Sequence, residues 1–552
     1  MVKLTRGDFL LTRLQFRVRL LCFFLFLFGT YQAHRLFKLQ VVENIRWTEQ
    51  AVRQRSNGLI LYEQRGEIID HSGEPLTGRE HYSCLAIFPP LLSKEERNLV
   101  EEVMGGSKLS LLSPLLINNP SAELLNLYTK NRLPGLNLCS IPLRYTSKPL
   151  ANHLLGYVDS TGKKGISGLE FMYQSALTGD NVVKLALIAD AYHRPIPGQG
   201  LKYQEINGKQ PHKNLVLTID LNWQLVVEEI MEEMKITKGA IILLEGGTGK
   251  IRALSSRPVF DPYNPEKSMK DHNESFINRA LKPYPPGSLI KMLVAAAALE
   301  EGKITPGTIF YDPGYINLGT NQYHCSLYKE SGHGLITFTQ ALAYGCDPVF
   351  IKIVQMIGQE RILAMAKHLG LGKSTELGLP GESAGYLPAG IEKNDFANLS
   401  LGEQGILVTP LQIAKVFQVV AGNGYYYPLT VVEGLQDLNG EWFERFLSPK
   451  GRKVLSSKTV VELRKMLETV VLYGTGQKAR IPQGVAGQTG TINAGKIRNG
   501  EKVYYGWFAG FTPVYDPHLV GVVFLEEDSL GGERAAEIFG LLMSRCLERQ
   551  KK

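Results

Sequence analysis

The chain is poor in cysteine, with six residues scattered over 552 positions: Cys22, Cys84, Cys139, Cys325, Cys346 and Cys546. So thin a distribution excludes a small fold held together by a dense disulfide framework. The spacing leaves open whether Cys84 and Cys139 pair. The chain also lacks a large excess of either charge, because its formal net charge is +8 with 21% charged residues. No basic run occurs beyond the N-terminus, so we expect no nucleic-acid partner.

The composition is that of a folded protein, with 44% hydrophobic residues. At this length two or three domains can each bury a sizeable core. Residues 194–213 are polar and contain glycine and proline, so we expect a linker there. Strands are expected near both ends of the region that follows, at 215–219, 240–244, 251–254, 503–511 and 518–525. Helical segments such as 220–234 and 292–299 lie between them, and a closing helix is expected at 532–547. This order predicts an α/β or α+β domain, a sheet covered by helices.

The first forty residues differ from the rest of the chain. Five basic residues open this segment: Lys3, Arg6, Arg13, Arg17 and Arg19. An uncharged apolar stretch at 20–33 follows, rich in Phe and Leu. A positive segment ahead of an apolar core is typical of an export signal. Because no small-residue cleavage site follows, we favour an uncleaved single-pass signal anchor over a cleaved signal peptide. A cytosolic protein with a buried Phe-rich helix is the remaining alternative, which the flanking arginines disfavour.

A serine and a lysine stand three residues apart at the start of a predicted helix. Two prolines and Gly287 cannot continue a helix backwards, so Ser288 falls in the first turn, where unpaired backbone N–H groups gather. Lys291 lies on the same helix face and can reach the serine oxygen. The apolar run ends at Gly302, a plausible end of the helix. This is the minimum for a serine acyl-enzyme that uses no histidine.

Other occurrences of similar patterns are weaker. The same serine–lysine spacing occurs at Ser160 and Lys163 and again at Ser326 and Lys329, but both lie in polar or glycine-rich segments where we expect solvated side chains. The glycine-rich turn at 245–250 superficially resembles a phosphate loop. It lacks both the first glycine and the metal-binding Ser or Thr of that motif, so a hairpin turn is the better interpretation.

With these motifs in place, the chain resembles the class B penicillin-binding proteins, the elongation-type peptidoglycan D,D-transpeptidases. The likeness also rests on residues 65–70, 153–158, 168–170, 255–262, 379–382, 402–412 and 506–510. It implies a cytoplasmic tail and anchor at 1–40, an elongated mixed α/β pedestal or dimerisation-type domain at 41–205, and a transpeptidase domain at 214–549. The catalytic domain would lie on the extracytoplasmic side of the cell membrane.

The resemblance also implies a mechanism and its residues. Ser288 would attack the D-Ala-D-Ala bond of a peptidoglycan stem peptide, with Lys291 as the base. Backbone N–H groups of Ser288 and Thr491 would form the oxyanion hole, and β-lactams would trap the same serine. Further substrate-binding residues would be Gln488, Thr489, Gly490 and Thr491. No cofactor would be required for catalysis. The expected partners are a polytopic membrane glycosyltransferase and other elongation or division proteins.

Two motifs depart from the family pattern. Where the family has Ser-x-Asn or Ser-x-Asp, this chain has Gly345, Cys346 and Asp347, so a hydroxyl is missing beside the catalytic Asp347. Where the family has Lys-Thr-Gly-Thr, Gln488 replaces the lysine and its positive charge. A catalytically impaired scaffold or regulator of the cell-wall machinery is therefore the alternative function. A β-lactamase or β-lactam sensor is a third, disfavoured by the large pedestal.

The resemblance points to a structural zinc site as well. Asp312, Cys325, His333 and Cys346 stand near the positions where elongation-type relatives can carry Asp, His and Cys ligands, with His324 in reserve. Mixed ligation of this kind suits tetrahedral zinc. The alternatives are a core histidine beside two buried thiols, or a disulfide between Cys325 and Cys346.

Overall fold

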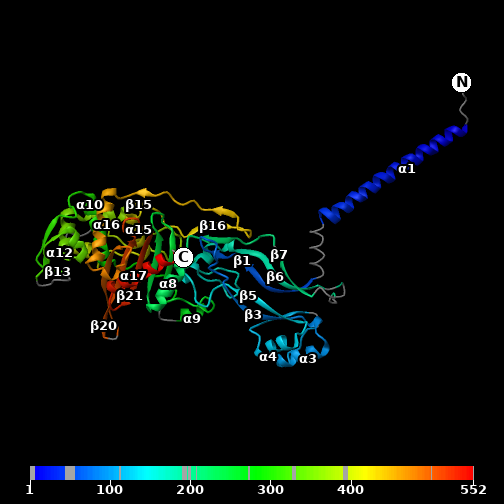
Figure 1. The fold of residues 1–552 in the computed structure, drawn as a ribbon, viewed down its shortest axis with the longest axis horizontal. Helices are drawn as coiled ribbons and strands as arrows, with labels where there is room; N and C mark the ends of the chain where they lie inside the picture. The colour runs from blue at the N-terminus through cyan, green and yellow to red at the C-terminus, as the bar shows by residue number, and fades with distance from the viewer. Residues whose placement is uncertain are drawn as a thin grey trace, which may run out of the picture. The chain divides into compact units, whose positions relative to one another are not determined.

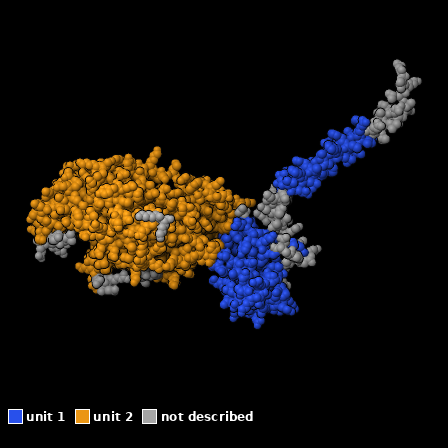
Figure 2. Space-filling model, viewed as in Figure 1, with its two compact units in different colours: residues 1–63, 82–141, 182–207 blue, residues 64–81, 142–181, 208–552 orange. Residues whose placement is uncertain are grey.

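The computed structural model describes residues 6–43, 56–110, 113–188, 190, 196, 200–206, 208–270, 274–325, 331–388, 396–403, 405–498 and 500–550. The chain forms two compact units, coloured separately in Figure 2. Unit 1 comprises residues 1–63, 82–141 and 182–207, and unit 2 comprises residues 64–81, 142–181 and 208–552. The units interleave along the chain, whereas the domains expected at 41–205 and 214–549 are contiguous ranges.

The N-terminal helix is the one candidate membrane span in the described ranges. Helix α1 (Arg6–Phe37) continues into a short π-helix, η1 (Lys38–Val42). The segment Phe16–Val42 is long and apolar enough to cross a membrane, and its side chains are not buried by the protein. It fits the single-pass anchor expected from the sequence.

Unit 1 is built from two small sheets and short helices. One sheet has the strand order β1 (Ser56–Arg65), β6 (Thr178–Ile188), β7 (Leu201–Ile206). The other has the order β4 (Leu115–Asn118), β3 (Glu80–Ile87), β5 (Leu136–Leu143). The helical segments are η2 (Pro89–Leu91), α3 (Lys94–Val103), α4 (Ala122–Asn126) and η3 (Leu127–Asn131).

The prediction of a linker at 194–213 is wrong for residues 201–206, which form a strand. Strand β7 lies within that range and pairs antiparallel with β6, for example Tyr203 with Leu185. A strand in this position is fixed by its partner on β6, which local composition does not reveal. Residues 194, 195, 197–199 and 207 of the range lie outside the described residues.

The main sheet of unit 2 is a five-stranded antiparallel sheet (Figure 1). Its strand order is β10 (Ile251–Arg257), β9 (Gly239–Glu245), β21 (Leu519–Asp528), β20 (Glu501–Thr512), β19 (Ala486–Arg498). Strands β9 and β10 are joined by the turn at 245–250, which is a hairpin turn as predicted. Strand β19 stands at one edge of the sheet.

Helices cover both faces of this sheet. Ile241 and Leu243 of β9 pack with helices α8 (Leu221–Glu233) and α17 (Gly532–Arg549), while Ala240, Ile242 and Leu244 face α10 (Ile290–Glu300) and α15 (Pro410–Ala421). The division follows from the alternation of side chains along a strand. The expected α/β class, a sheet covered by helices, is therefore confirmed.

Smaller elements complete unit 2. A second sheet has the order β17 (Trp442–Arg445), β16 (Val432–Gln436), β8 (Asn214–Leu217), β2 (Ile68–Ile69). Three two-stranded pairs are β11 (Ile309–Asp312) with β14 (Gly334–Thr337), β12 (Tyr315–Leu318) with β13 (Asn321–His324), and β15 (Tyr425–Tyr426) with β18 (Arg452–Lys453). The other helices are α5 (Asn152–Leu155), α6 (Gly168–Met172), α7 (Gln174–Leu177), α9 (Pro265–Met269), α11 (Phe338–Tyr344), α12 (Asp347–Ile357), α13 (Gln359–His368), α14 (Phe396–Leu401), α16 (Ser457–Leu472) and η5 (Gln477–Ala479).

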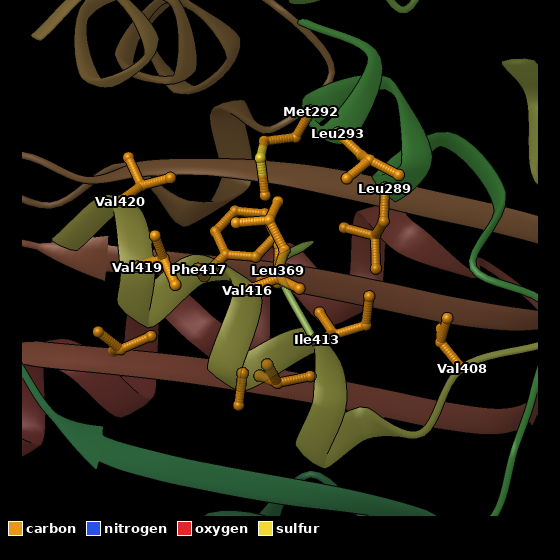
Figure 3. Close-up of a cluster of buried hydrophobic side chains, with 14 of the residues drawn as sticks. Leu289, Met292, Leu293, Leu369, Val408, Ile413, Val416, Phe417, Val419 and Val420 are labelled. Atoms are coloured by element: carbon orange, nitrogen blue, oxygen red, sulfur yellow. The ribbon is translucent and has the colours of Figure 1, made fainter. Parts of the chain in front are cut away.

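Helix α10 is held by an apolar cluster shown in Figure 3. In that view Leu289 and Met292 point toward Phe417 of α15, and all three side chains are no more than 2% exposed. Burying a side chain of this size contributes about 1.5–3 kcal/mol. The cluster fixes the helix that begins at the serine–lysine motif.

Candidate active site

Ser288 lies in a tight turn that leads directly into α10. The turn is a 3-10 helix, η4 (Gly287–Leu289), so Ser288 falls in the first helical turn as predicted. Gly287 has φ +57°, and a Cβ on it would lie 2.7 Å from Ile492 of β19. Only glycine allows both this backbone conformation and so close an approach of the edge strand. Two hydrogen bonds anchor the turn, from Gly287 N to Gly402 O at 3.0 Å and from Trp507 Nε1 to Pro285 O at 3.1 Å.

Lys291 is the centre of the hydrogen-bond network. Its side chain is 1% exposed, and Nζ donates to Ser288 Oγ at 2.8 Å, to Gly345 O at 3.0 Å and to Asp347 Oδ1 at 2.6 Å. An ammonium group has three N–H donors, and these three acceptors match them. The structure therefore brings together Ser288, Lys291 and Asp347, three of the four residues expected to be catalytic.

This network fixes the direction in which Lys291 can accept a proton. A neutral amine keeps two N–H donors and one lone pair. The Gly345 carbonyl and an ionised Asp347 can only accept hydrogen bonds, so they retain the two donors. The lone pair then points at Ser288, the one partner that carries a proton. The arrangement suits removal of the serine proton.

The second motif sits between two helices. Helix α11 ends at Gly345, whose φ of +66° is the left-handed conformation common at helix ends. Asp347 opens α12, where the helix dipole favours its negative charge. A Cβ on Gly345 would lie 3.8 Å from Lys291 Nζ and 4.0 Å from Thr475 Cγ2. The room for the family's serine side chain is thus present although the side chain is not.

The third motif lies on the edge strand β19. The ideal Cβ position on Gly287 is 3.5 Å from Thr491 N, so the serine turn lies alongside this part of the strand. Thr491 Oγ1 accepts a hydrogen bond from Gly532 N at 2.9 Å, and the hydroxyls of Thr489 and Thr475 are 2.7 Å apart. Their roles in the oxyanion hole and in substrate binding stay predictions.

Gln488 is turned into the protein. It is 1% exposed, and its Oε1 accepts a hydrogen bond from Thr489 N at 3.0 Å. Within the described part of the chain, its buried Nε2 has no hydrogen-bond partner. The amide is therefore not presented to solvent in this structure, and its binding of a substrate carboxylate stays a prediction. Gly490 packs against Pro286, because a Cβ there would lie 2.8 Å from the carbonyl oxygen of Pro286.

Two side chains at the site escaped the sequence analysis. Thr475, from the segment after α16, reaches Thr489 as described above. The second is Glu403, which follows Gly402 in the chain. Burial raises the pKa of its carboxyl, and the negative charge of Asp347 raises it further. The segment 402–412 is one of those that carry the family likeness, but nothing in it distinguishes Glu403 before the fold is known.

The four expected zinc ligands converge beside the second motif. One ligand atom from each of Asp312, Cys325, His333 and Cys346 lies within 4.8 Å of the others. His333 Nδ1 is 2.7 Å from Asp312 Oδ2 and 3.3 Å from Cys325 Sγ, and Cys346 Sγ is 3.2 Å from Asp312 Oδ2. Asp312 and both cysteines are fully buried. This donor set fits a tetrahedral zinc ion. His324, the reserve ligand, is exposed at the end of β13 and lies outside this group.

The charge state of this group is consistent with a cation site. Burial works against the charge of Asp312, but hydrogen bonds from His333 and from Gly314 N hold its pKa below the usual value. The Cys325 contact and burial raise the pKa of the Cys346 thiol far above its usual value. Without a cation the Cys346 thiol stays protonated, and binding of a metal ion releases its proton.

Of the two rival serine–lysine pairs, only Ser160 and Lys163 lie in the part of the chain that the structure describes. Ser160 lies in an exposed turn of unit 2. Ser326 and Lys329 lie outside the described residues.

Comparison with known proteins agrees with this geometry. The family model of the penicillin binding protein transpeptidase domain matches residues 239–544. The chain is 28% identical over 549 residues to stage V sporulation protein D of Bacillus subtilis, covering 93% of this chain and 82% of the relative. It is 28% identical over 435 residues to peptidoglycan D,D-transpeptidase FtsI of Escherichia coli K12, covering 76% and 69%.

A solved structure extends the likeness to nearly the whole chain. It is described as "Structural coordination of polymerization and crosslinking by a peptidoglycan synthase complex", and one of its chains matches with a TM-score of 0.67 and 25% identity over 96% of this chain and 98% of that one. The chain belongs to the family of penicillin-binding protein transpeptidases. Within that family, its relatives and the additional N-terminal unit mark it as a class B penicillin-binding protein.

Proposed function

We propose that this protein is a membrane-anchored serine D,D-transpeptidase that cross-links peptidoglycan stem peptides. The observation that carries the proposal is the buried Nζ of Lys291, which lies 2.8 Å from Ser288 Oγ and is also bonded to Gly345 O and Asp347 Oδ1. The names of the relatives support the reaction class, and α1 supports the anchor. The catalytic unit would work on the extracytoplasmic side, beside a polytopic glycosyltransferase.

The proposed reaction has two acyl transfers. Ser288 Oγ bonds to the carbonyl carbon of the penultimate D-Ala while its proton passes to Lys291. The C–N bond to the terminal D-Ala breaks, and the departing amine takes that proton. An amine from a neighbouring stem peptide then attacks the acyl carbon and releases Ser288. N–H groups of Ser288 and Thr491 would stabilise the oxyanion in each step.

A second candidate function rests on the second and third motifs. Gly345 supplies no hydroxyl to Lys291, and the Gln488 amide is buried rather than presented to a substrate. These two features favour a scaffold or regulator that keeps the fold and turns over slowly. The two functions differ in whether Ser288 forms an acyl-enzyme.

The decisive experiment is labelling of the detergent-solubilised full chain with a fluorescent penicillin, followed by intact mass. We expect one adduct, mapped to Ser288 and lost in Ser288→Ala. The matched control is Ser160→Ala, which removes the other described serine that stands three residues before a lysine and should label like the wild type. Absence of label in a chain that shows a cooperative thermal transition would favour the scaffold.

We also propose that Asp312, Cys325, His333 and Cys346 hold a structural zinc ion. Burial of Asp312 and both cysteines and the mutual distances of the four residues support this assignment. Elemental analysis after gentle purification should find about one zinc per chain, and Cys346→Ser should lose most of it. Clearly less than stoichiometric metal in the wild type would contradict the assignment. The test does not depend on transpeptidase activity.

A further inference from the structure

Two cysteines face each other in the core of unit 1. Cys84 lies on β3 and Cys139 on β5, and these strands are neighbours in the sheet. The hydrogen bond from Phe88 N to Gly135 O, 2.7 Å long, sets their register. A second bond, from Gly78 N to Arg144 O, shows that the strands run antiparallel, and it is offset by one residue from the first. Cys84 and Cys139 follow the register of the first bond, because both contribute to the same apolar cluster as Phe88.

The register places the cysteines directly opposite one another. Cys84 is four residues before Phe88, and Cys139 is four residues after Gly135. In antiparallel strands such positions are directly paired, with side chains on the same face and Cα atoms about 4.5–5.5 Å apart. This separation falls inside the range of roughly 4.4–6.8 Å that disulfides span.

The Cys84 side chain reaches the opposite strand at the position that this register requires. Its Sγ lies 3.7 Å from the carbonyl oxygen of Cys139, and the Cys139 thiol is the next cause after burial that raises the pKa of the Cys84 thiol. Both residues are almost fully buried, at 0% and 1% exposure, in one apolar cluster with Val183 and Leu185 of β6. A pair of thiols in this cluster has no metal-binding partner of the kind found around Cys346 among the described residues.

We propose that Cys84 and Cys139 form a disulfide that joins β3 to β5. The inference rests on the proposed extracytoplasmic location, because disulfides persist in oxidising compartments and are rare in the cytosol. In the reaction the two thiols lose two protons and two electrons and an S–S bond forms. The disulfide of a thiol–disulfide oxidoreductase, the class of oxidant required, breaks and takes them up as two thiols.

The bond forms while the unit folds. Burial raises the pKa of the Cys84 thiol to about 11, and burial also raises that of Cys139, so the reactive thiolate is scarce once the sheet has closed. Because the bond is buried, a reductant should open it slowly in the native protein and quickly after denaturation. The bond closes a loop of about 55 residues, long enough to restrict the unfolded chain markedly.

The test counts thiols in the full chain, expressed with its own anchor and purified in detergent without reductant. The protein is denatured with a chelator present and alkylated with N-ethylmaleimide before intact mass and peptide mapping. Of the six cysteines, we expect four to be alkylated and one linked peptide pair containing Cys84 and Cys139. Treatment with dithiothreitol before alkylation should raise the count to six.

Two variants sharpen the test, and their thiols are likewise counted after denaturation. In Cys84→Ala all five remaining cysteines should be alkylated, because Cys139 loses its partner. In Cys546→Ala, which removes a buried cysteine of α17, the linked pair should persist and three should be alkylated. Six alkylated cysteines in the unreduced wild type would overturn the proposal. A linked pair of Cys325 with Cys346 would instead contradict the zinc assignment. Penicillin labelling of the same sample reports separately on the proposed function.

Discussion

Gly345 offers a direct test of what the missing hydroxyl does at this site. We compare Gly345→Ser with Gly345→Ala. Both variants add a Cβ, which would lie 3.8 Å from Lys291 Nζ and 4.0 Å from Thr475 Cγ2, ordinary contact distances that need no rearrangement. Only the serine adds an oxygen, one bond beyond Cβ and able to hydrogen-bond to Lys291 Nζ. The pair therefore separates the hydroxyl from the added bulk.

The expected loss of stability follows from the backbone conformation of Gly345, and the expected change in acylation rate follows from the contribution of a proton-transfer group. Because Gly345 has φ +66°, each variant should lose about 1–2 kcal/mol of stability relative to the wild type. This loss is common to both and cancels in their comparison. A positioned proton-transfer group contributes about a hundredfold or more to rate. We therefore expect Gly345→Ser to be acylated about a hundred times faster than Gly345→Ala.

The assay is the second-order rate constant for acylation of the full chain by a fluorescent penicillin, with thermal unfolding measured on the same samples. Equal acylation rates in two variants with equal melting temperatures would refute the reasoning. They would mean that Lys291, held by Gly345 O and Asp347, works without a hydroxyl at this position.

Three further changes test other parts of the structure. Gln488→Lys replaces the buried amide by an ammonium, which attracts the drug carboxylate, so the penicillin concentration needed for half-labelling should fall about tenfold. Gln488→Met adds a side chain of similar length without a charge and should not lower this concentration. Equal labelling of the two variants would exclude a charge effect. Burial lowers the pKa of His153 to about 4, so its neutral form is favoured in the folded state, and wild-type stability should fall as pH drops from 6.5 to 4. His153→Gln should remove up to about 3 kcal/mol of that fall, measured by urea unfolding at each pH. Arg279→Met leaves the Glu526 carboxylate without its buried partner and should lose about 3–5 kcal/mol; adding Glu526→Gln should recover part of it in the same unfolding assay.

The sequence predicts the parts of this protein that local chemistry decides. The turn before Ser288 and the spacing to Lys291 depend on neighbouring residues, and the structure has both. The apolar runs at 240–244 and 251–254 likewise predict two strands joined by a turn, and the structure has them. The four residues proposed to hold zinc lie close together, and their positions came from the family resemblance.

What the sequence does not predict depends on long-range pairing. Composition predicts a linker where β7 lies, because the strand is defined only by its pairing with β6. The pairing of β2 with β8 joins segments about 145 residues apart. The inward turn of Gln488 follows from its bond to Thr489 N, which composition cannot show. The charge of Asp347 acts on Glu403 in the folded protein, where the neighbouring Gly402 accepts a hydrogen bond from Gly287 N. Each of these needs the tertiary structure.

The interleaving of the two units has a consequence for how the chain is made. Unit 1 is complete once residue 207 has been synthesised, whereas strand β2 of unit 2 must wait for β8 and then for β16. At about 5–20 residues per second, the delay between β2 and β8 alone is about 7–30 s. During this time Ile68 and Ile69, at 0% and 5% exposure in the finished protein, have no partner strand. A nascent chain stalled near residue 210 would therefore present an unprotected apolar strand to any chaperone or protease it meets.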